Sequence, residues 1–157
     1  MNIKIKKLHP NAVIPSYAKH GDAGMDLTAI HKDYDNEGNV VYKTGLAFEI
    51  PEGFVGLLFP RSSNAKKDLI LSNSVGVLDS GYRGEVMFKF KRVFNLVEFG
   101  RVMDNENERH VVINDYNIGD KIGQLIILPY PQIEFEEVQE LSMTERGEGG
   151  YGSTDKK

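Results

Sequence analysis

The chain has 157 residues, the length of one ordinary domain, which is enough to bury a continuous apolar core. It carries 19 Lys and Arg against 23 Asp and Glu, and its net charge of −4 argues against a general nucleic-acid-binding protein. The absence of cysteine excludes disulfides, thiolate nucleophiles and zinc–thiolate sites.

No segment of the sequence has the pattern of a signal peptide or a membrane-spanning helix. The lysines between Met1 and Pro10 are not followed by an apolar run, and the longest apolar stretch is residues 125–128. We therefore expect a cytoplasmic protein with neither a membrane nor a nucleic acid as its partner.

Strand signals dominate the chain. Apolar residues alternate with polar ones, or form short runs, at residues 3–5, 54–59, 86–90 and 124–128. Turn sequences separate these runs, at residues 37–38, 51–53, 80–81 and 117–119. Helical character is limited to one predicted turn over residues 62–68. The pattern predicts an all-β domain, which is a sandwich, a jelly roll or a barrel of short strands.

The first candidate site is Pro60-Arg61-Ser62-Ser63, directly after the strand predicted over residues 54–59. An arginine with two hydroxyls and free backbone amides suits an anion such as a phosphate. A capped helix start with a solvent-facing arginine is the simpler alternative for this segment alone.

A second candidate lies in the glycine-bounded hairpin of residues 76–85, where Asp79 and Tyr82 stand three residues apart. A carboxylate held there can orient water. Hydrolysis of a phosphoanhydride needs a positioned water and charge neutralisation more than covalent chemistry. The alternative is that Asp79 caps a turn and Tyr82 packs in the core.

The third candidate is the glycine-rich segment of residues 146–154. It lacks both the following helix of a dinucleotide fingerprint and the lysine of a P-loop. Its glycine amides, the Arg146 guanidinium and the hydroxyls of Ser153 and Thr154 can nevertheless surround a phosphate. Such a segment cannot supply a core and would remain a mobile tail unless something docks it.

Two shorter segments, residues 23–27 and 119–125, each have the pattern of a turn that leads into a strand. The four histidines show no metal-ligand spacing, so we expect surface or packing roles for them.

In chain order, these five segments resemble the five motifs of the trimeric dUTP pyrophosphatase (dUTPase) family, and the resemblance spans residues 23–154. It implies a distorted jelly-roll-like β barrel over residues 1–145. It also implies a flexible glycine-rich C-terminal segment, residues 146–157, that closes a neighbouring subunit's active site in a homotrimer. The implied reaction is hydrolysis of dUTP to dUMP and pyrophosphate by water attack on the α-phosphorus, with Mg²⁺ on the triphosphate. Magnesium keeps much of its water, which agrees with the lack of a dedicated ligand cluster.

The resemblance also implies roles for single residues. Asp79 matches the catalytic residue that activates water, and Asp26 matches an acidic residue that reaches the metal through water. Base and sugar contacts are implied for Asn73, Gly76, Val77, Leu78 and Tyr82. Contacts on the phosphate side are implied for Arg61, Ser62, Ser63 and Gln124. The closing segment contributes Arg146, Gly149, Tyr151, Gly152, Ser153 and Thr154, with Tyr151 over the uracil.

Three features depart from the family pattern. Tyr151 replaces the usual phenylalanine, and Asp155 stands where another glycine is usual. We expect neither to prevent closure. Residues 95–116, which include the charged stretch 104–109, form a longer connection between the third and fourth motifs than is usual in the family. They are predicted to form an extended exposed hairpin, with a partner-binding insert as the alternative.

Two other functions fit the same motifs. A dCTP deaminase-like enzyme shares the fold and the triphosphate pocket, but it needs a glutamate to act on the base, and the Asp79–Tyr82 pair favours dUTP. A nucleotide-sensing regulatory module that signals through the insert is the second alternative.

Overall fold

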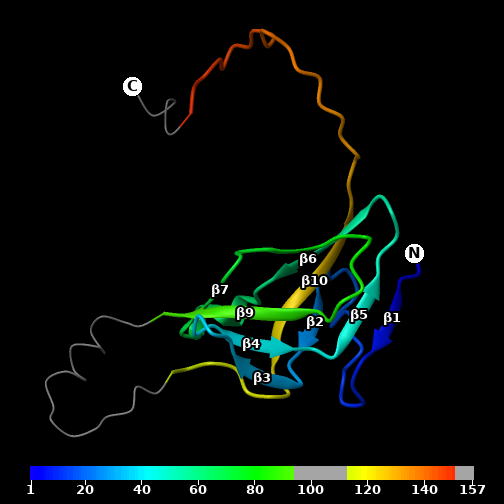
Figure 1. The fold of residues 1–157 in the computed structure, drawn as a ribbon, viewed down its shortest axis with the longest axis vertical. Helices are drawn as coiled ribbons and strands as arrows, with labels where there is room; N and C mark the ends of the chain where they lie inside the picture. The colour runs from blue at the N-terminus through cyan, green and yellow to red at the C-terminus, as the bar shows by residue number, and fades with distance from the viewer. Residues whose placement is uncertain (94–112, 151–157) are drawn as a thin grey trace, which may run out of the picture.

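The computed structural model describes residues 1–93 and 113–150, and its regular structure is almost entirely β (Figure 1). The strands are β1 (Lys4–Lys7), β2 (Met25–Thr28), β3 (His31–Tyr34), β4 (Val40–Lys43), β5 (Leu46–Glu49), β6 (Phe54–Phe59), β7 (Leu69–Leu71), β8 (Gly76–Leu78), β9 (Met87–Arg92) and β10 (Lys121–Pro129). Within these described ranges the one helical element is the 3-10 helix η1 (Ser62–Lys66). The all-β prediction is confirmed.

The strands pair antiparallel in three sheets. Two sheets have four strands, in the orders β2-β10-β6-β8 and β3-β4-β9-β7, and the third consists of β1 and β5. The predicted jelly-roll-like barrel therefore takes the form of packed sheets, and the strands of the described residues do not close into one continuous barrel.

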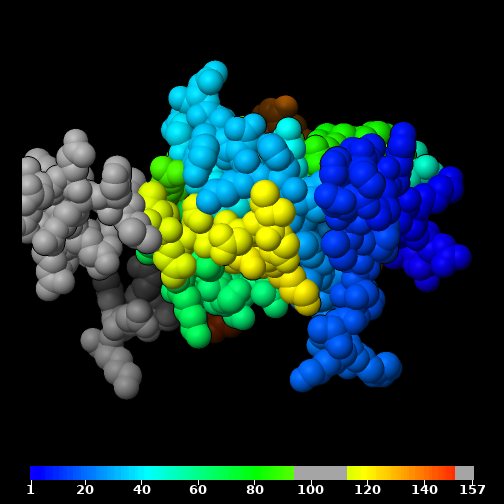
Figure 2. Space-filling view, turned by 90° about the horizontal axis from the view of Figure 1, so that it is seen from below, coloured from blue at the N-terminus to red at the C-terminus, as the bar shows by residue number. Residues whose placement is uncertain are grey.

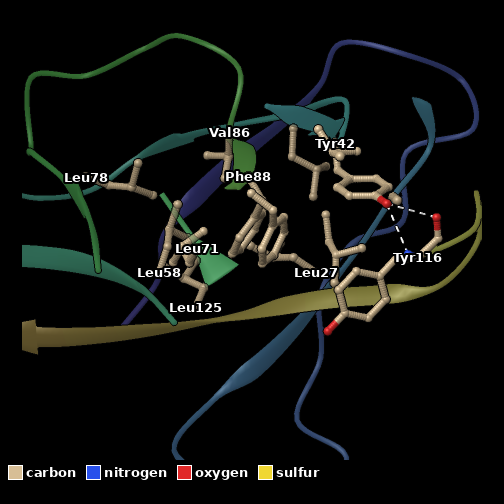
Figure 3. Close-up of a cluster of buried hydrophobic side chains, with 14 of the residues drawn as sticks. Leu27, Tyr42, Leu58, Leu71, Leu78, Val86, Phe88, Tyr116 and Leu125 are labelled. Atoms are coloured by element: carbon tan, nitrogen blue, oxygen red, sulfur yellow. Dashed lines mark hydrogen bonds between the residues drawn. The ribbon is translucent and has the colours of Figure 1, made fainter. Parts of the chain in front are cut away.

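The apolar core lies between the two four-stranded sheets (Figure 3). In β9, Phe88 and Phe90 are buried while Met87 and Lys89 are exposed, as the predicted alternation requires. Phe88 reaches across to the other sheet, because a Cβ added to Gly123 on β10 would collide with its ring. Each phenylalanine buried in this way contributes about 1.5–3 kcal/mol to folding.

Several local predictions agree with the structure. The strand predicted over residues 54–59 is β6, and the one predicted over residues 124–128 lies inside β10. The predicted helical turn is η1, which ends two residues earlier than residue 68. Gly53 and Gly119 occupy turns with φ of 79° and 93°, a region that glycine enters without a steric penalty.

After β10 the chain leaves the sheets. The backbone N–H of Tyr130 still donates to the carbonyl of Gly53 at 2.9 Å. Residues 131–150, called the arm below, then extend away from the body of the molecule, from orange to red in Figure 1. Among the described residues, the hydrogen bonds of the arm are confined to the turn between Thr144 and Gly149.

Two predicted features fall largely outside the structure. Of the hairpin predicted over residues 95–116, the structure describes the last four residues, and residues 151–157 lie outside it. In the parts of the chain that it describes, no helix combines the length and the apolar character needed to cross a membrane.

Candidate active site

The register of β10 brings three distant motifs together. Gln124 pairs with Asp26 on β2 and, on its other side, with Phe59 at the end of β6. Because Pro60 and Arg61 follow Phe59 directly, the Arg61 side chain emerges next to Asp26. Residues that lie far apart in the sequence thus become neighbours through sheet pairing.

Asp26 is the centre of an ion-pair group. Arg61 Nε donates to its Oδ1 at 2.8 Å, and Lys121 Nζ lies 2.8 Å from its Oδ2. Burial alone would raise the pKa of Asp26, but hydrogen bonds and charge from Lys121 and Arg61 lower it below its usual value. The carboxylate is therefore ionised at neutral pH and holds both cations at one place.

A cavity of about 440 Å³, called the β10 cavity below, opens beside this group. Four residues implied by the motifs line it together with Asp22, namely Asp26, Arg61, Ser62 and Gln124. A Cβ on Gly24 would lie 2.5 Å from Gln124 Oε1, so a side chain at this position would displace the Gln124 amide from the turn. The cavity combines cationic, hydroxyl and carboxylate groups, which suits an anion with an associated metal ion.

A second cavity of about 340 Å³, the hairpin cavity, lies at β8. The pairing of β8 with β6 presents the hairpin at the edge of its sheet. Six residues implied by the motifs line the cavity, namely Asn73, Gly76, Val77, Leu78, Asp79 and Tyr82. The structure therefore brings Asn73, Asp79 and Tyr82 together around one cavity.

Local hydrogen bonds fix the shape of this hairpin. The N–H of Tyr82 donates to the carbonyl of Asp79 at 3.0 Å, and the Tyr82 hydroxyl donates to the carbonyl of Glu85 at 3.1 Å. The Tyr82 ring lies so close to Gly84 that a Cβ there would collide with it. Asp79 is exposed, and its carboxylate is free to meet water. Tyr82 is 44% exposed and is not a core residue.

The turn before β8 contains an unusual backbone conformation. Ser74 has a φ of 60°, which non-glycine residues seldom adopt, and it follows Asn73 directly. The N–H of Val75 donates to the carbonyl of Asn73 at 2.6 Å and closes this turn. Such conformations persist where the surrounding structure enforces them and are common at ligand sites.

The closing motif lies elsewhere. Arg146 and Gly149 belong to the exposed turn of the arm, where Arg146 Nε donates to the carbonyl of Gly149 at 2.9 Å. Figure 1 shows this turn far from the sheets that carry both cavities. Tyr151, Gly152, Ser153, Thr154 and Asp155 lie outside the described residues.

The implied site is thus divided within one chain. The hairpin cavity and the β10 cavity have no lining residue in common among the described residues, and the arm contributes to neither. Ser63 lines neither cavity, although its hydroxyl lies 3.5 Å from Arg61 Nη1. Sequence reasoning did not identify Lys121, whose position three residues before Gln124 in the same motif was the available signal.

The described residues contain no group of three or more His, Cys, Asp or Glu side chains arranged to hold a metal ion. A metal at the β10 cavity would therefore need most of its ligands from a bound molecule or from water.

Comparisons with known proteins converge on one family. A family model described as dUTPase matches residues 10–155. The deoxyuridine 5'-triphosphate nucleotidohydrolase of Clostridioides difficile is 39% identical over 155 residues, which cover 98% of this chain and 97% of that protein.

Two solved structures extend the likeness to the fold. A dUTPase variant of Staphylococcus bacteriophage 80alpha, solved with dUpNHpp, gives a TM-score of 0.74 at 29% identity and covers 98% of each chain. A dUTPase variant from phage phi11 of S. aureus, described as showing the coordination of a structural Mg(II) ion, gives a TM-score of 0.68 at 28% identity. That comparison covers 89% of this chain and 98% of the phage protein.

Proposed function

The chain belongs to the dUTPase family, and from that premise we propose that it hydrolyses dUTP to dUMP and pyrophosphate in active sites shared between the subunits of a homotrimer. The observation that carries the proposal is the hairpin cavity, which combines an exposed carboxylate, Asp79, with the ring of Tyr82 and the polar turn at Asn73.

The hairpin cavity is proposed to bind the nucleoside. Asn73 and the backbone of residues 76–78 line the hairpin cavity and offer hydrogen-bonding groups for the edge of uracil, and the same residues are proposed to exclude a methyl group on the base. The half-exposed ring of Tyr82 provides an apolar surface for deoxyribose, against which a 2′-hydroxyl would be crowded. These contacts would select dUTP over dTTP and UTP.

Asp79 is proposed to act as the general base. Its carboxylate takes a proton from a water molecule while the water oxygen bonds to the α-phosphorus. The bond from the α-phosphorus to the oxygen that bridges to the β-phosphorus breaks, and pyrophosphate leaves. The hydrogen bond from the Tyr82 N–H to the Asp79 carbonyl holds the proposed general base, Asp79, and the ring proposed to contact deoxyribose, Tyr82, in one turn. A positioned base of this kind contributes about 10²–10⁴-fold to a rate.

The β10 cavity is proposed to bind the phosphates. Arg61 and Ser62 donate to phosphate oxygens, and Gln124 adds an amide from the facing strand. Arg61 and Lys121 supply positive charge close to the developing negative charge of the leaving group. Ser63 is proposed to support Arg61.

The same residues fit a magnesium ion held mainly by the triphosphate. The carboxylates of Asp22 and Asp26 line the cavity, and oxygen groups are the ligands that magnesium prefers. Asp26 also holds Arg61 and Lys121, so its contact with the metal is proposed to run through water. When bound, magnesium neutralises charge on the phosphate oxygens.

The arm is proposed to serve a neighbouring subunit. Residues 146–157 would then bring Arg146, Gly149, Gly152, Ser153 and Thr154 over the outer phosphates, with Tyr151 against the uracil. The division of the described site into two cavities and a remote arm supports sites that more than one chain completes. Residues 1–145 would form the β domain, and the closing segment would order on substrate.

The direct test measures pyrophosphate and ammonia separately with dUTP, dCTP, dTTP and UTP as substrates. The proposal expects pyrophosphate from dUTP, little from the other three nucleotides, and no ammonia from dCTP. Ammonia from dCTP would instead indicate a deaminase, and binding of dUTP without any product would indicate a nucleotide-sensing module.

A further inference from the structure

The turn that carries Arg61 and Ser62 lacks anchors of its own. η1 has five residues, none of them buried, and Arg61 at its N-cap makes no side-chain capping hydrogen bond. A 3-10 helix of this length has poor hydrogen-bond geometry and little intrinsic stability. The ion pair with Asp26 holds the end of the Arg61 side chain, and contacts from another part of the chain must fix the backbone of η1 that follows it.

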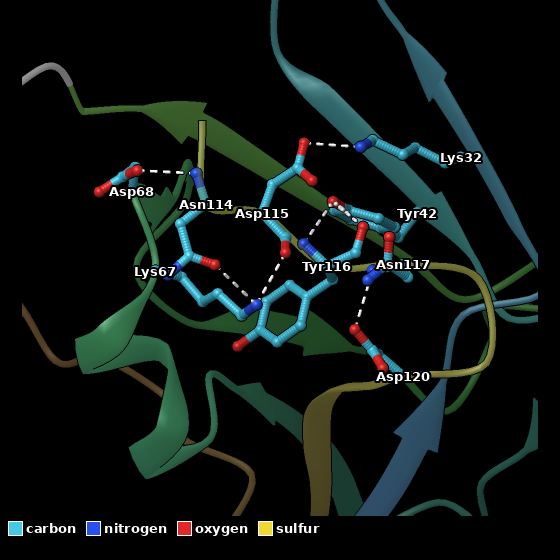
Figure 4. Close-up of polar contacts among 9 residues, drawn as sticks. All are labelled: Lys32, Tyr42, Lys67, Asp68, Asn114, Asp115, Tyr116, Asn117 and Asp120. Atoms are coloured by element: carbon cyan, nitrogen blue, oxygen red, sulfur yellow. Dashed lines mark hydrogen bonds and ion pairs between the residues drawn. The ribbon is translucent and has the colours of Figure 1, made fainter. Parts of the chain in front are cut away.

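Residues 114–116, which do not line the β10 cavity, supply those contacts. Asn114 Nδ2 donates to the carbonyl of Lys66 at 2.6 Å. Figure 4 shows the second bond of Asn114, whose N–H donates to Asp68 Oδ2 at 2.8 Å. Lys67 Nζ donates to the carbonyl of Asp115 at 2.7 Å. In Figure 2, residues 113–121, in yellow, lie between the blue-to-cyan β3–β4 region and the green residues that follow β6.

Among these contacts, the one that Tyr116 makes reaches the residue nearest to Arg61 in the sequence, Asn64. The Tyr116 hydroxyl donates to Asn64 Oδ1 at 3.1 Å, and Asn64 Nδ2 donates to the carbonyl of Leu69 at 2.8 Å. Burial raises the pKa of Tyr116, whereas a hydrogen bond with Ser63 and the charge of Arg61 oppose that rise. The hydroxyl thus contacts Asn64, in the middle of η1.

Tyr116 is itself held rigidly by the core. Its N–H donates to the Tyr42 hydroxyl at 3.1 Å, and that hydroxyl donates to the Tyr116 carbonyl at 3.0 Å (Figure 3). Its ring centroid lies 5.9 Å from that of Tyr42 and 5.8 Å from that of Phe90. The side chain is 3% exposed, so its hydroxyl has a fixed position relative to the sheets.

We propose that Tyr116 is a positioning residue for phosphate recognition, which acts through Asn64 to hold η1 so that Arg61 and Ser62 face the β10 cavity. Neither Tyr116 nor Asn64 lines that cavity, so their effect must pass through the turn. The inference rests on the proposed function, because it assigns the β10 cavity to the phosphates of dUTP.

The proposal separates phosphate binding from nucleoside binding. The hairpin cavity shares no lining residue with the β10 cavity among the described residues, and it does not include the turn at η1. Loss of the Tyr116 hydroxyl should therefore weaken binding of a triphosphate and leave binding of a nucleoside unchanged. A residue with only a structural role in the core would affect both ligands together.

The experiment uses the full chain with Tyr116→Phe, Asn64→Leu and the double variant. Inhibition of dUTP hydrolysis is measured with dUpNHpp and, separately, with deoxyuridine. Tyr116→Phe is expected to weaken inhibition by dUpNHpp roughly 2- to 10-fold, the effect of one hydrogen bond. Inhibition by deoxyuridine should not change. Tyr116→Phe should add little in the Asn64→Leu background, because the two residues act through one contact.

Tyr34→Phe is the matched control, since Tyr34 is a half-exposed tyrosine on β3 and lines neither cavity. It should leave both inhibition constants unchanged. Equal effects of Tyr116→Phe on the two ligands, no effect on dUpNHpp, or an undiminished effect in the Asn64→Leu background would each overturn the inference. Wild-type protein that released no pyrophosphate from dUTP would contradict the proposed function itself, so the two failures are distinguishable.

Discussion

The body of the molecule and its arm differ in how far they bury their large apolar side chains. In the body, residues from all three sheets bury side chains such as Phe90 and Leu125 completely. In the arm, Phe135, Leu141 and Met143 are 95%, 87% and 99% exposed. The body therefore has an apolar core of its own. The arm, by contrast, carries large apolar side chains that no other described residue of the chain covers.

This difference explains why a site predicted from one sequence is divided in the structure. The body holds Asp79 at the hairpin cavity in the turn that the Tyr82 N–H closes, and it holds Arg61 at the β10 cavity through the ion pair with Asp26. Arg146 lies on the arm, and within residues 1–93 and 113–150 no hydrogen bond joins the arm to the body. If the arm of one chain packs on another, both the apolar residues and Arg146 acquire partners.

The largest expected effect is on catalysis by the body. Asp79→Asn keeps the size of the side chain but removes the base, so kcat for dUTP should fall about 10²–10⁴-fold. Binding of dUpNHpp, measured by calorimetry, should remain within a few-fold of wild type. Unchanged turnover would remove Asp79 from the mechanism.

The next effect separates the arm's closing segment from the rest. A chain that ends at residue 145 keeps the apolar part of the arm and loses Arg146 and the glycine-rich segment. Turnover should fall roughly 10²–10³-fold, the usual effect of losing groups that stabilise developing charge. Sedimentation should still show the trimer. Dissociation into monomers would mean that residues 146–157 hold subunits together rather than close the site.

A smaller effect is expected on association. Phe135→Ser removes the most exposed ring of the arm, and burial of such a side chain against a neighbour would be worth about 1.5–3 kcal/mol. Sedimentation at falling protein concentration should show dissociation at higher concentration than for wild type. Glu136→Ser, the adjacent exposed position, is the control and should not shift it. Identical behaviour of the two variants would argue that Phe135 has no partner.

The smallest effect concerns a polar contact of the body. Hydrogen bonds from Asn39, together with Lys89, lower the pKa of Asp35 from 3.8 to about 2. Because the folded-state pKa is depressed, this carboxylate stabilises the fold above the unfolded value, and the contribution is lost as pH falls from 3.8 to about 2.

Urea unfolding of wild type and Asp35→Asn across acidic pH checks this expectation. The difference in free energy of unfolding should shrink as pH falls through that window. A difference that stays constant with pH would show that the contact does not depend on the charge of Asp35.

How much the sequence could predict depended on the range of the interactions. β6 and β9 were predicted well, since a continuous apolar run and a strict alternation are local signals. β3 (His31–Tyr34) was not predicted, because its residues are mostly polar and exposed, and it is a strand through its pairing with β4. Propensity alone carries no signal for such a strand.

The same distinction holds for the site. Most residues that line the hairpin cavity lie close together in the sequence. The motif that predicted Asp79 and Tyr82 therefore also predicted their neighbours in the cavity. The Lys121–Asp26 pair was missed because it depends on an irregular register between Lys121 and Gly123 in β10. The contact of Tyr116 with Asn64 spans 52 residues and leaves no local pattern.

The most direct test of the division between body and arm is complementation between two inactive chains. The Asp79→Asn chain keeps residues 146–157 at the end of its arm. The chain that ends at residue 145 lacks this closing segment but keeps Asp79. If the arm serves a neighbour, equal co-expression should produce mixed trimers in which about a quarter of the sites pair an intact body with an intact arm. Pyrophosphate release from dUTP should then recover to a similar fraction of wild type. A mixed trimer as inactive as either chain alone would contradict the account, because it would mean that each arm closes the site of its own body.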